Sequence, residues 1–425
     1  MLPLDCGQEF DPARDADFFA TLPARPGVLL VEMADVSAQP YMMRTADVRR
    51  AAERLLRPPD TTSKRLNLRG VAARIRYRVT GSKFEQTLAF YEEARARLPG
   101  RYRDLLRLRP PAVLKVNLRN AYPRCYVTRK IRGDGGFYFG PFASRRSAEA
   151  FAEGFLDLFK TRRCQIKIRR DPTFPGCIYS EMKMCLAPCF AGCTKVEYEA
   201  EVGRVLASLD TSGAALTEEL EREREEASEA LDFERAAALH KRLEKVSGAL
   251  RGLPELARRI EKIDAVILQR AAEEKTIDVY PVRGGLIGEP IVLRFLDTSE
   301  PKSVESILRN ALEPANLAAP PATHAAERPD AQGAVESSGD FRVRYGLREA
   351  PPELSEHLML LARWFYSKPR DGEILFKDGE WPYRRILRAC GRLLAPPAAP
   401  QPESTSANAA ELPNQISSQN KTSGN

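Results

Sequence analysis

The sequence has no long apolar run and no secretory leader, and both absences narrow the kind of protein it encodes. No stretch approaches the roughly eighteen consecutive apolar residues that a membrane-spanning helix needs. We therefore expect a cytoplasmic protein with no membrane partner. Residues 1–20 contain acidic residues and no apolar run behind a basic region, which argues against a signal peptide and an oxidising compartment. Disulfide bonds are for this reason the least favoured use of the eight cysteines.

The composition is that of a soluble chain with several cores and an uneven charge. The 425 residues are 43% hydrophobic and 29% charged, which is enough for two or three cores of ordinary size. The net charge is +8, but residues 101–170 hold 18 Lys and Arg against 5 Asp and Glu. A block of this density favours a polyanionic partner, because each neutralised phosphate releases counterions. A merely solvated basic surface is the alternative.

Five of the eight cysteines lie within the thirty residues from Cys164 to Cys193. Thiolates grouped in this way can converge on one soft metal centre, either a tetrahedral zinc ion or an iron–sulfur cluster, and the spacing does not choose between them. Unliganded buried thiols would explain the scattered cysteines but not a cluster with Pro188 inside its last short spacing. The predicted metal ligands follow the spacing C-x12-C-x7-C-x3-C: Cys164, Cys177, Cys185 and Cys189.

The first part of the chain predicts a small α/β unit. Residues 1–22 carry few signals and are expected to form an arm, and residues 23–118 contain short apolar or alternating runs between Pro and Gly signals. The expected elements are strands at 28–31 and 74–79 and helices at 45–56 and 84–98.

The next segment predicts strands that carry aromatic and basic residues. Apolar runs at 113–116 and 125–130 and a glycine-rich turn at 133–136 precede the aromatic segment 137–142, and a helix with Ser147 as its N-cap follows. Aromatic rings among basic groups can stack on bases, although such rings are more often part of a core. The candidate DNA-binding residues are Arg129, Lys130, Arg132, Tyr138, Arg145, Arg146, Arg162 and Arg163.

Behind the cysteines, residues 216–250 predict two amphipathic helices around a turn at Leu231 and Asp232. Nine acidic residues and two arginines lie between Glu218 and Glu234, so DNA would repel this helical pair. We expect a protein partner, although a solvated coiled segment between domains is the alternative.

Residues 22 to about 296 resemble the UvrC family, which supplies component C of the ABC excinuclease in bacterial nucleotide excision repair. The resemblance rests on short motifs in a shared order, which are Pro26-Gly27-Val28, Val127-Thr128-Arg129-Lys130, Tyr138-Phe139-Gly140-Pro141-Phe142, Cys185-Leu186-Ala187-Pro188-Cys189, and the run from Glu226 through Leu231-Asp232-Phe233 to Ala237. The last of these is similar to the UVR motif by which the family binds UvrB.

The resemblance implies a [4Fe–4S] cluster on Cys164, Cys177, Cys185 and Cys189, with zinc as the alternative, and Cys193 as a spare thiol or substitute ligand. It also implies UvrB and DNA as partners. The residues that would bind UvrB are Leu231, Phe233, Glu234 and Ala237. We expect the cluster to have a structural role, with redox sensing left open.

The family carries an N-terminal GIY-YIG nuclease, and this chain departs from its active site. The first motif reads Gly27-Val28-Leu29, with leucine where tyrosine is expected, and the second reads Tyr41-Met42-Met43, with methionine in place of glycine. Leucine cannot exchange the proton of an attacking water. Mg²⁺ is expected only if this site is active.

The other expected catalytic positions are also changed. Ala51 stands where an arginine is expected, Phe90 where a metal-binding glutamate is expected, and Val113 where an asparagine is expected. A register shift leaves three remnant candidates, Tyr41, Arg50 and Glu92, but a site misplaced by even an ångström loses most of its rate. We therefore expect the nuclease fold to persist without its active site.

The C-terminal part departs from the family as well. Residues 263–295 resemble the segment that leads into the family's ribonuclease-H-like nuclease, but neither the Asp/His pattern of that nuclease nor a helix-hairpin-helix repeat is evident. An Ala- and Pro-rich stretch follows, then a short helical region expected to fold back on the body, and a tail of Pro, Ser, Asn and Ala expected to be disordered.

The sequence thus predicts an α+β multidomain protein with a degenerate GIY-YIG-like unit, a cysteine-cluster module and a UVR hairpin. The predicted divisions are 1–22, 23–118, 119–210, 211–252, 253–300, 301–350, 351–394 and 395–425, with 211–252 as the hairpin and 301–350 as a linker. Two functions compete: a non-cutting repair component that binds DNA and UvrB, and a diverged endonuclease that still makes the 3′ incision.

Overall fold

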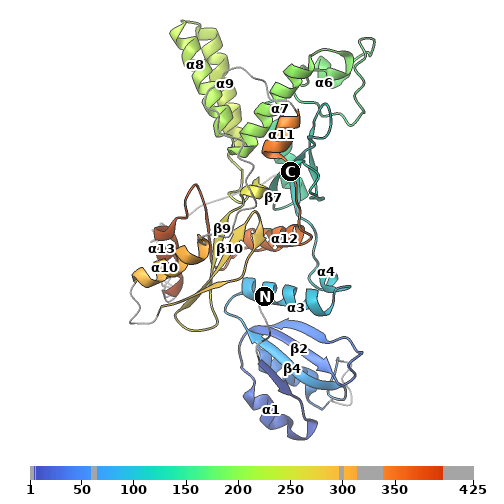
Figure 1. Cartoon of the computed structure of the whole chain (residues 1–425), viewed down its shortest axis with the longest axis vertical. Helices are drawn as coiled ribbons and strands as arrows, with labels where there is room; N and C mark the ends of the chain where they lie inside the picture. The colour runs from blue at the N-terminus through green and yellow to red at the C-terminus, as the bar shows by residue number, and fades with distance from the viewer. Residues whose placement is uncertain (1–3, 5, 59–64, 296–300, 314–337, 396–425) are drawn as a thin grey trace, which may run out of the picture. The chain divides into compact units, whose positions relative to one another are not determined.

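A computed structural model of the chain describes residue 4 and residues 6–58, 65–295, 301–313 and 338–395. The chain forms three antiparallel sheets, and a long helical hairpin precedes the last strand of the second sheet in sequence (Figure 1). None of the helices in the described ranges has the length and apolar character needed to span a bilayer.

The first sheet has helices on both faces. In the second strand, Leu29 and Val31 point toward two helices, whereas Val28 and Leu30 point toward a third helix on the other face. The strand order is β1-β4-β2-β3, with β1 (Cys6–Glu9), β2 (Gly27–Met33), β3 (Tyr41–Thr45) and β4 (Ala72–Val79). The helices are α1 (Asp15–Thr21), which follows a 3-10 turn at Pro12–Arg14, α2 (Val48–Leu56) and α3 (Lys83–Arg97).

One prediction for this region is wrong, and another is right except for where its helix begins. Residues 1–22 do not form an arm in the described positions, because Cys6–Glu9 pairs with β4 and Phe18, Phe19 and Leu22 are buried in the same core. The predicted helix at 45–56 begins at Val48 instead, where the Asp47 side chain accepts from the Arg50 amide and caps the helix.

The second sheet is the framework of the middle region. Its strand order is β6-β5-β7-β8, with β5 (Ala112–Val116), β6 (Cys125–Thr128), β7 (Phe137–Phe142) and β8 (Arg258–Arg259). Phe137 and Phe139 pack against α5 (Arg145–Leu156) and α7 (Lys195–Asp210), whereas Tyr138 packs on the opposite face. The N-cap of α5 is Ser144 rather than Ser147, because Ser144 accepts from the Ser147 amide in a capping box. A short helix, α4 (Tyr102–Leu105), precedes this sheet.

The predicted helical pair is present as α8 (Ala214–Glu229) and α9 (Phe233–Leu250), which run side by side (Figure 1). The turn places Leu231 at a φ of 58°, and Asp232 caps α9 by accepting from the Arg235 amide at 3.0 Å. The base of the hairpin joins the core of the middle sheet through Leu216, Leu220 and Val246.

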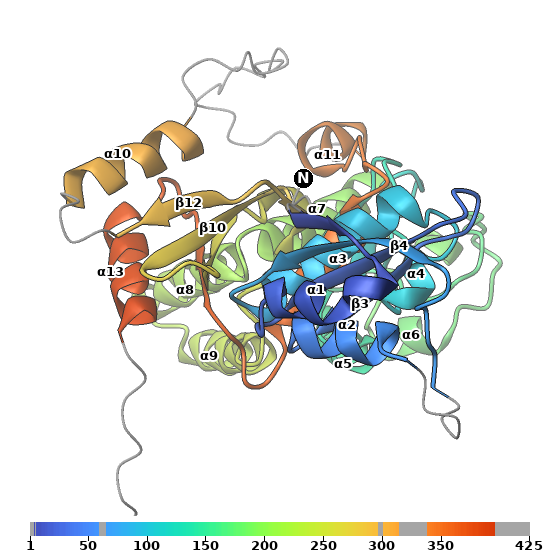
Figure 2. The ribbon, with the colours of Figure 1, turned by 90° about the horizontal axis from the view of Figure 1, so that it is seen from below.

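The third sheet joins segments that are far apart in sequence. Residues at alternating positions of β9 face opposite sides, so Ile267 packs with α12 and Val266 with α10 and α13. Figure 2 shows α10 and α13 beside β10 and β12. The elements are a 3-10 turn at Ile260–Lys262, β9 (Ala265–Arg270), β10 (Thr276–Arg283), β11 (Leu286–Ile287), β12 (Ile291–Arg294), α10 (Pro301–Leu312), α11 (Ser338–Tyr345), α12 (Leu354–Phe365), β13 (Glu373–Phe376) and α13 (Tyr383–Leu394).

This sheet corrects two more predictions. The segment 301–350 is not simply a linker, because Val304 and Leu308 of α10 and Phe341 of α11 are buried in two cores. The segment 351–394 does fold back on the body, but it is not wholly helical, since β13 adds a strand beside β9. The middle of the predicted linker and nearly all of the tail at 395–425 lie outside the described residues.

Candidate nucleic-acid interface and metal centre

The cysteine loop, defined here as residues 160–194, connects α5 to α7 and contains only short helical turns. These are α6 (Ile178–Glu181) and a 3-10 turn at Pro188–Phe190. Lys183, Ala187 and Ala191 all have left-handed backbone conformations, with φ values of 55°, 55° and 61°. Such conformations are strained for residues other than glycine and are concentrated at functional sites.

The four predicted ligand thiols are electrostatic neighbours in this loop. Burial, together with the nearby Cys164, Cys189 and Cys177, raises the pKa of the Cys185 thiol to about 11. The Ala187 amide donates to Cys185 Sγ at 3.3 Å, and an Arg162 guanidinium nitrogen lies 3.8 Å from Cys164 Sγ. N–H donors directed at sulfur stabilise thiolates, which are the metal-binding form of cysteine.

Four thiols are chemically suitable ligands for a metal centre, but their sulfur atoms do not surround a single point in the structure. Among the described residues, no three His, Cys, Asp or Glu side chains are placed to bind one ion. In a four-iron cluster each cysteine binds a different iron, so its ligands lie farther apart than those of a single zinc ion. Cys193 is 6% exposed and packs in the core of the middle region, and this burial raises the pKa of its thiol, with smaller upward effects of Glu197 and Cys189.

Arg162 holds the start of this loop in place. Its Nε donates to the Tyr122 carbonyl at 2.8 Å and its guanidinium donates to the Ile166 carbonyl at 2.9 Å, while its amide donates to the Tyr198 hydroxyl at 3.0 Å. The residue is 6% exposed. Its side-chain donors thus bind backbone carbonyls, and its contact with DNA stays a prediction.

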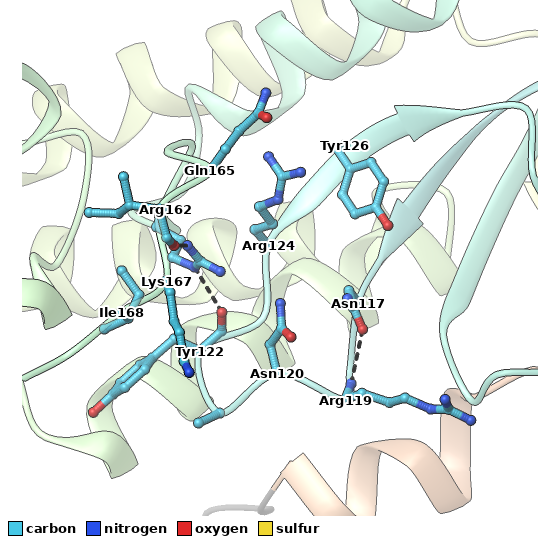
Figure 3. A pocket seen from close by; sticks show the side chains of 12 residues that line it. Asn117, Arg119, Asn120, Tyr122, Arg124, Tyr126, Arg162, Gln165, Lys167 and Ile168 are labelled. Carbon is cyan, nitrogen blue, oxygen red and sulfur yellow. Dashed lines mark hydrogen bonds between the residues drawn. The ribbon is translucent and has the colours of Figure 1, made fainter.

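A polar pocket of about 570 Å³ lies between β6 and the start of the cysteine loop (Figure 3). Arg124 stacks over the Tyr126 ring at 4.5 Å, and both line the pocket. The pocket is large enough for a nucleotide, and its cations and amides suit phosphate and base edges. Its other labelled residues are Asn117, Arg119, Asn120, Tyr122, Arg162, Gln165, Lys167 and Ile168.

The remaining predicted DNA-binding residues divide into two groups. Arg129, Lys130, Arg132, Arg145 and Arg146 are exposed. Their exposure leaves them accessible to a nucleic-acid backbone.

Tyr138 and Arg163 are less accessible. Tyr138 is fully buried and its hydroxyl donates to Asp134 at 3.0 Å, so its ring cannot stack on a base and that prediction is wrong. Arg163 is 16% exposed at its side chain and pairs with Asp157 at 2.7 Å. Tyr138 therefore offers no group to DNA, whereas a contact of Arg163 with DNA stays a prediction.

The tip of the hairpin exposes two large apolar side chains. Leu231 is 71% exposed and Phe233 is 68% exposed, and Glu234 and Ala237 are exposed on the adjoining turn of α9. The predicted UvrB-binding residues thus form one accessible patch. Exposed apolar residues of this size, surrounded by polar ones, mark interaction surfaces.

The three catalytic remnants are not gathered at one place. Tyr41 packs on the face of the first sheet that carries α2, whereas Glu92 belongs to α3, which covers the other face. Arg50 is exposed on α2 and pairs with Asp47 at 3.5 Å. Leu29 is fully buried, and Phe90 is 4% exposed with the Arg44 guanidinium 5.7 Å from its ring centroid.

The sequence did not single out the pocket beside the cysteine loop. Arg119, Arg124 and Lys167 were counted only as part of the basic block at 101–170. The available signal was the Asn-rich turn around Asn117 and Asn120 between two strands. This turn forms a pocket only because the start of the cysteine loop lies opposite it.

Two family descriptions match the chain. Residues 112–208 match the "UvrC/Cho excinuclease, middle domain" and residues 214–249 match the "UvrB/uvrC motif". The first covers β5 to α7 and therefore both the pocket and the cysteine loop, and the second covers the hairpin. No solved structure matches the chain.

Several curated proteins named UvrABC system protein C are similar to it. That of Dehalococcoides mccartyi is 28% identical over 276 residues, covering 63% of this chain and 44% of the relative. The protein of Ruminiclostridium cellulolyticum is 30% identical, and the match covers 41% of this chain and 28% of the relative. The protein of Oleidesulfovibrio alaskensis is 31% identical, and the match covers 44% of this chain and 27% of the relative. The match thus spans less than half the length of each relative. The middle domain and the UvrB/uvrC motif, together with these relatives, support a member of the UvrC family.

Proposed function

We propose that this protein is a component of nucleotide excision repair that binds DNA and UvrB and does not itself cut DNA. The observation that carries the proposal is the presence of two unlike surfaces within the matched regions. One is the cationic pocket beside the cysteine loop, and the other is the acidic hairpin with an apolar tip. The first suits a polyanion and the second suits a protein.

The hairpin supports a protein partner through burial. Its stripe of Leu220, Leu243 and Val246 is 0 to 9% exposed, so the hairpin packs without using Leu231 or Phe233. Fully burying one such side chain is worth about 1.5–3 kcal/mol. Burying Leu231 and Phe233 against a second protein would therefore stabilise a complex. The family match makes UvrB the proposed partner.

The cysteine loop is proposed to hold a [4Fe–4S] cluster on Cys164, Cys177, Cys185 and Cys189, with zinc as the alternative. The N–H donors to Cys185 and Cys164 and the mutual effect of the thiols support a shared centre. The cluster would fix the loop, and through Arg162 and Tyr122 it would fix one wall of the pocket. The proposed role is structural.

The proposal that the protein does not cut DNA is supported by the side chains of the first sheet. A hydrolytic site needs a proton acceptor and a metal ligand close together. Leu29 and Phe90 are buried where those groups are expected, and Tyr41 lies across the sheet from α3. No Mg²⁺-dependent step is therefore assigned to the residues of this sheet.

An incision assay tests the proposal. The full chain is mixed with UvrA, UvrB and Mg²⁺ on a defined damaged duplex, and binding is followed separately by a salt titration. We expect DNA binding that weakens with salt and no cleavage. Cleavage that disappears in Tyr41→Phe or Glu92→Ala would instead establish the diverged 3′ endonuclease, and failure to bind both DNA and UvrB would remove the chain from the pathway.

A further inference from the structure

Four arginines line one cavity between the middle sheet and α12, and a fifth, Arg44 of the first sheet, is an electrostatic neighbour of one of them, Arg363. Arg44 comes from β3, Arg107 and Arg109 from the segment before β5, Arg129 from the end of β6, and Arg363 from α12. Arg107, Arg109, Arg129 and Arg363 line one cavity of about 330 Å³. All five are exposed to solvent, so a ligand can reach them.

These arginines carry their charge without a counterion from the protein. Among the described residues, no carboxylate lies within ion-pair distance of any of the five. Arg363 donates to the Leu106 and Arg107 carbonyls at 2.9 and 3.0 Å, and Arg129 donates to the Pro110 carbonyl at 2.9 Å. These bonds orient the guanidinium groups but leave their charge uncompensated.

Like charges repel in this group. Burial lowers the pKa of the Arg363 guanidinium below its ordinary value, and the positive charge of Arg44 lowers it further. Arg44 is itself held in place, because it donates to Thr87 Oγ1 at 3.0 Å and lies over the Phe90 ring. A protein that fixes two repelling cations side by side gains stability when an anion binds between them.

The rest of the cavity wall also suits an anion with an attached apolar group. Ser144, the N-cap of α5, lies on one side, and the rings of Phe142 and Tyr366 line the wall. The amides of the first turn of α5 have no acceptor within the helix, which adds positive potential at this side.

We propose that this arginine cavity is a phosphate-binding site. Arginine forms paired hydrogen bonds to phosphate oxygens, and several arginines around one cavity are the arrangement that phosphate recognition uses. The inference rests on the proposed function for its ligand, which is the DNA backbone, because the cavity lies on the same chain as the cationic pocket beside the cysteine loop. A free phosphate or a mononucleotide shares the chemistry and is the other source to be distinguished.

The test compares charge-removing variants in a salt titration. Arg363→Gln and Arg109→Gln are measured with a duplex oligonucleotide, and each should reduce the slope of log affinity against log salt by about 1. Arg109 has no side-chain hydrogen bond within the described part of the chain, so it reports on binding even if Arg363→Gln disturbs the fold. The matched control is Arg392→Gln, which removes an equal charge from a residue paired with Glu373 at 2.6 Å.

Parallel titrations with inorganic phosphate and with dAMP separate the ligand sources. If the native protein binds DNA and both variants keep the native slope, the inference is overturned while the proposed function stands. If the native protein binds phosphate or dAMP but not DNA, and the variants bind neither, the phosphate site is confirmed and the assignment of DNA as its ligand is overturned. Binding of none of the three ligands overturns both.

Discussion

The first sheet and the middle sheet are both four-stranded and antiparallel, yet they use their polar side chains in opposite ways. In the first region, Tyr91 and Tyr102 donate inward to Glu356 of α12 at 2.7 and 2.8 Å, and Glu85 accepts from the Gly81 amide at 2.7 Å. In the middle region, Asn117, Arg124 and the thiols of the cysteine loop line an accessible pocket or lie close to it.

The difference lies in what the side chains of each region contribute. Leu29 and Phe90 are buried and apolar, so they stabilise the first sheet but supply no group that could transfer a proton or bind a metal ion. The start of the cysteine loop is held by hydrogen bonds from Arg162 to backbone carbonyls. The polar pocket beside that loop therefore gives the middle region accessible groups that the core of the first sheet lacks.

The largest expected effect is on the cysteine loop. Changing Cys164, Cys177, Cys185 and Cys189 to serine should remove all bound iron, because serine does not replace thiolate as a ligand here. The measurement is iron content and visible absorption after anaerobic purification. Cys6→Ser, at an exposed cysteine, is the control and should keep the iron. Native protein that is colourless and iron-free would contradict the cluster, and bound zinc would favour the alternative.

The next effect tests the inward network of the first region. Glu356→Ala leaves the Tyr91 and Tyr102 hydroxyls and the Arg103 guanidinium without their acceptor. The expected loss is about 4 kcal/mol in the free energy of unfolding, measured by urea denaturation. Glu349→Ala, at an exposed glutamate, should change it by less than about 0.5 kcal/mol. Equal effects in the two variants would mean that the network does not hold α12 to α3.

A third test uses pH at the contact between the first and third sheets. Burial, together with the neighbouring Glu85, raises the pKa of Asp278 to about 7. The unfolded chain loses this proton near pH 4, so between about pH 4 and 7 the folded state binds more protons and stability falls as pH rises. Asp278→Asn should remove this fall and be more stable than the native chain by about 3 kcal/mol near pH 8.

The comparison is made by urea denaturation of both proteins near pH 5 and near pH 8. The difference between them should shrink at the lower pH, because Asp278 is then neutral like asparagine. A difference that does not vary with pH would show that Asp278 ionises normally in the folded protein.

The smallest effect on folding is expected at the hairpin tip. Leu231→Ser and Phe233→Ser should change the free energy of unfolding by less than about 0.5 kcal/mol, because both side chains are mostly exposed. The same variants should abolish UvrB binding, measured by titration calorimetry. Val343→Ser, which removes an apolar group that is 63% exposed on α11, is the matched control. Unchanged UvrB binding in both tip variants would place the contact elsewhere.

Local pattern predicted much of this structure. The spacing of Leu216, Leu220 and Ala227 led to the hairpin, because helix periodicity is a property of a short segment. The family resemblance of the middle region was likewise carried by contiguous motifs, and it is confirmed by the matches at 112–208 and 214–249. The ligand set of the cysteines stays a prediction.

Other features depended on contacts between distant segments. Nothing in the polar sequence Cys6–Glu9 marks it as a strand, and it becomes one because β4 offers an edge to pair with. The mixture of aromatic and basic residues around Tyr138 predicts a DNA contact, but the packing of α12 and Leu347 on that face buries the ring. A sequence pattern shows that a residue is apolar, but it does not show which face of a sheet other elements will cover.

The sequence by itself determined the helical hairpin, several other helices and strands, the cysteine spacing and the uneven charge, since each follows from residues close together in the chain. The tertiary structure alone decided which charged groups meet. It brought Arg44, Arg109 and Arg363 to one place and separated Tyr41 from α3. The physical reason is that apolar burial, which drives the packing of the sheets, is not directional, so the positions of polar groups follow only from the completed arrangement.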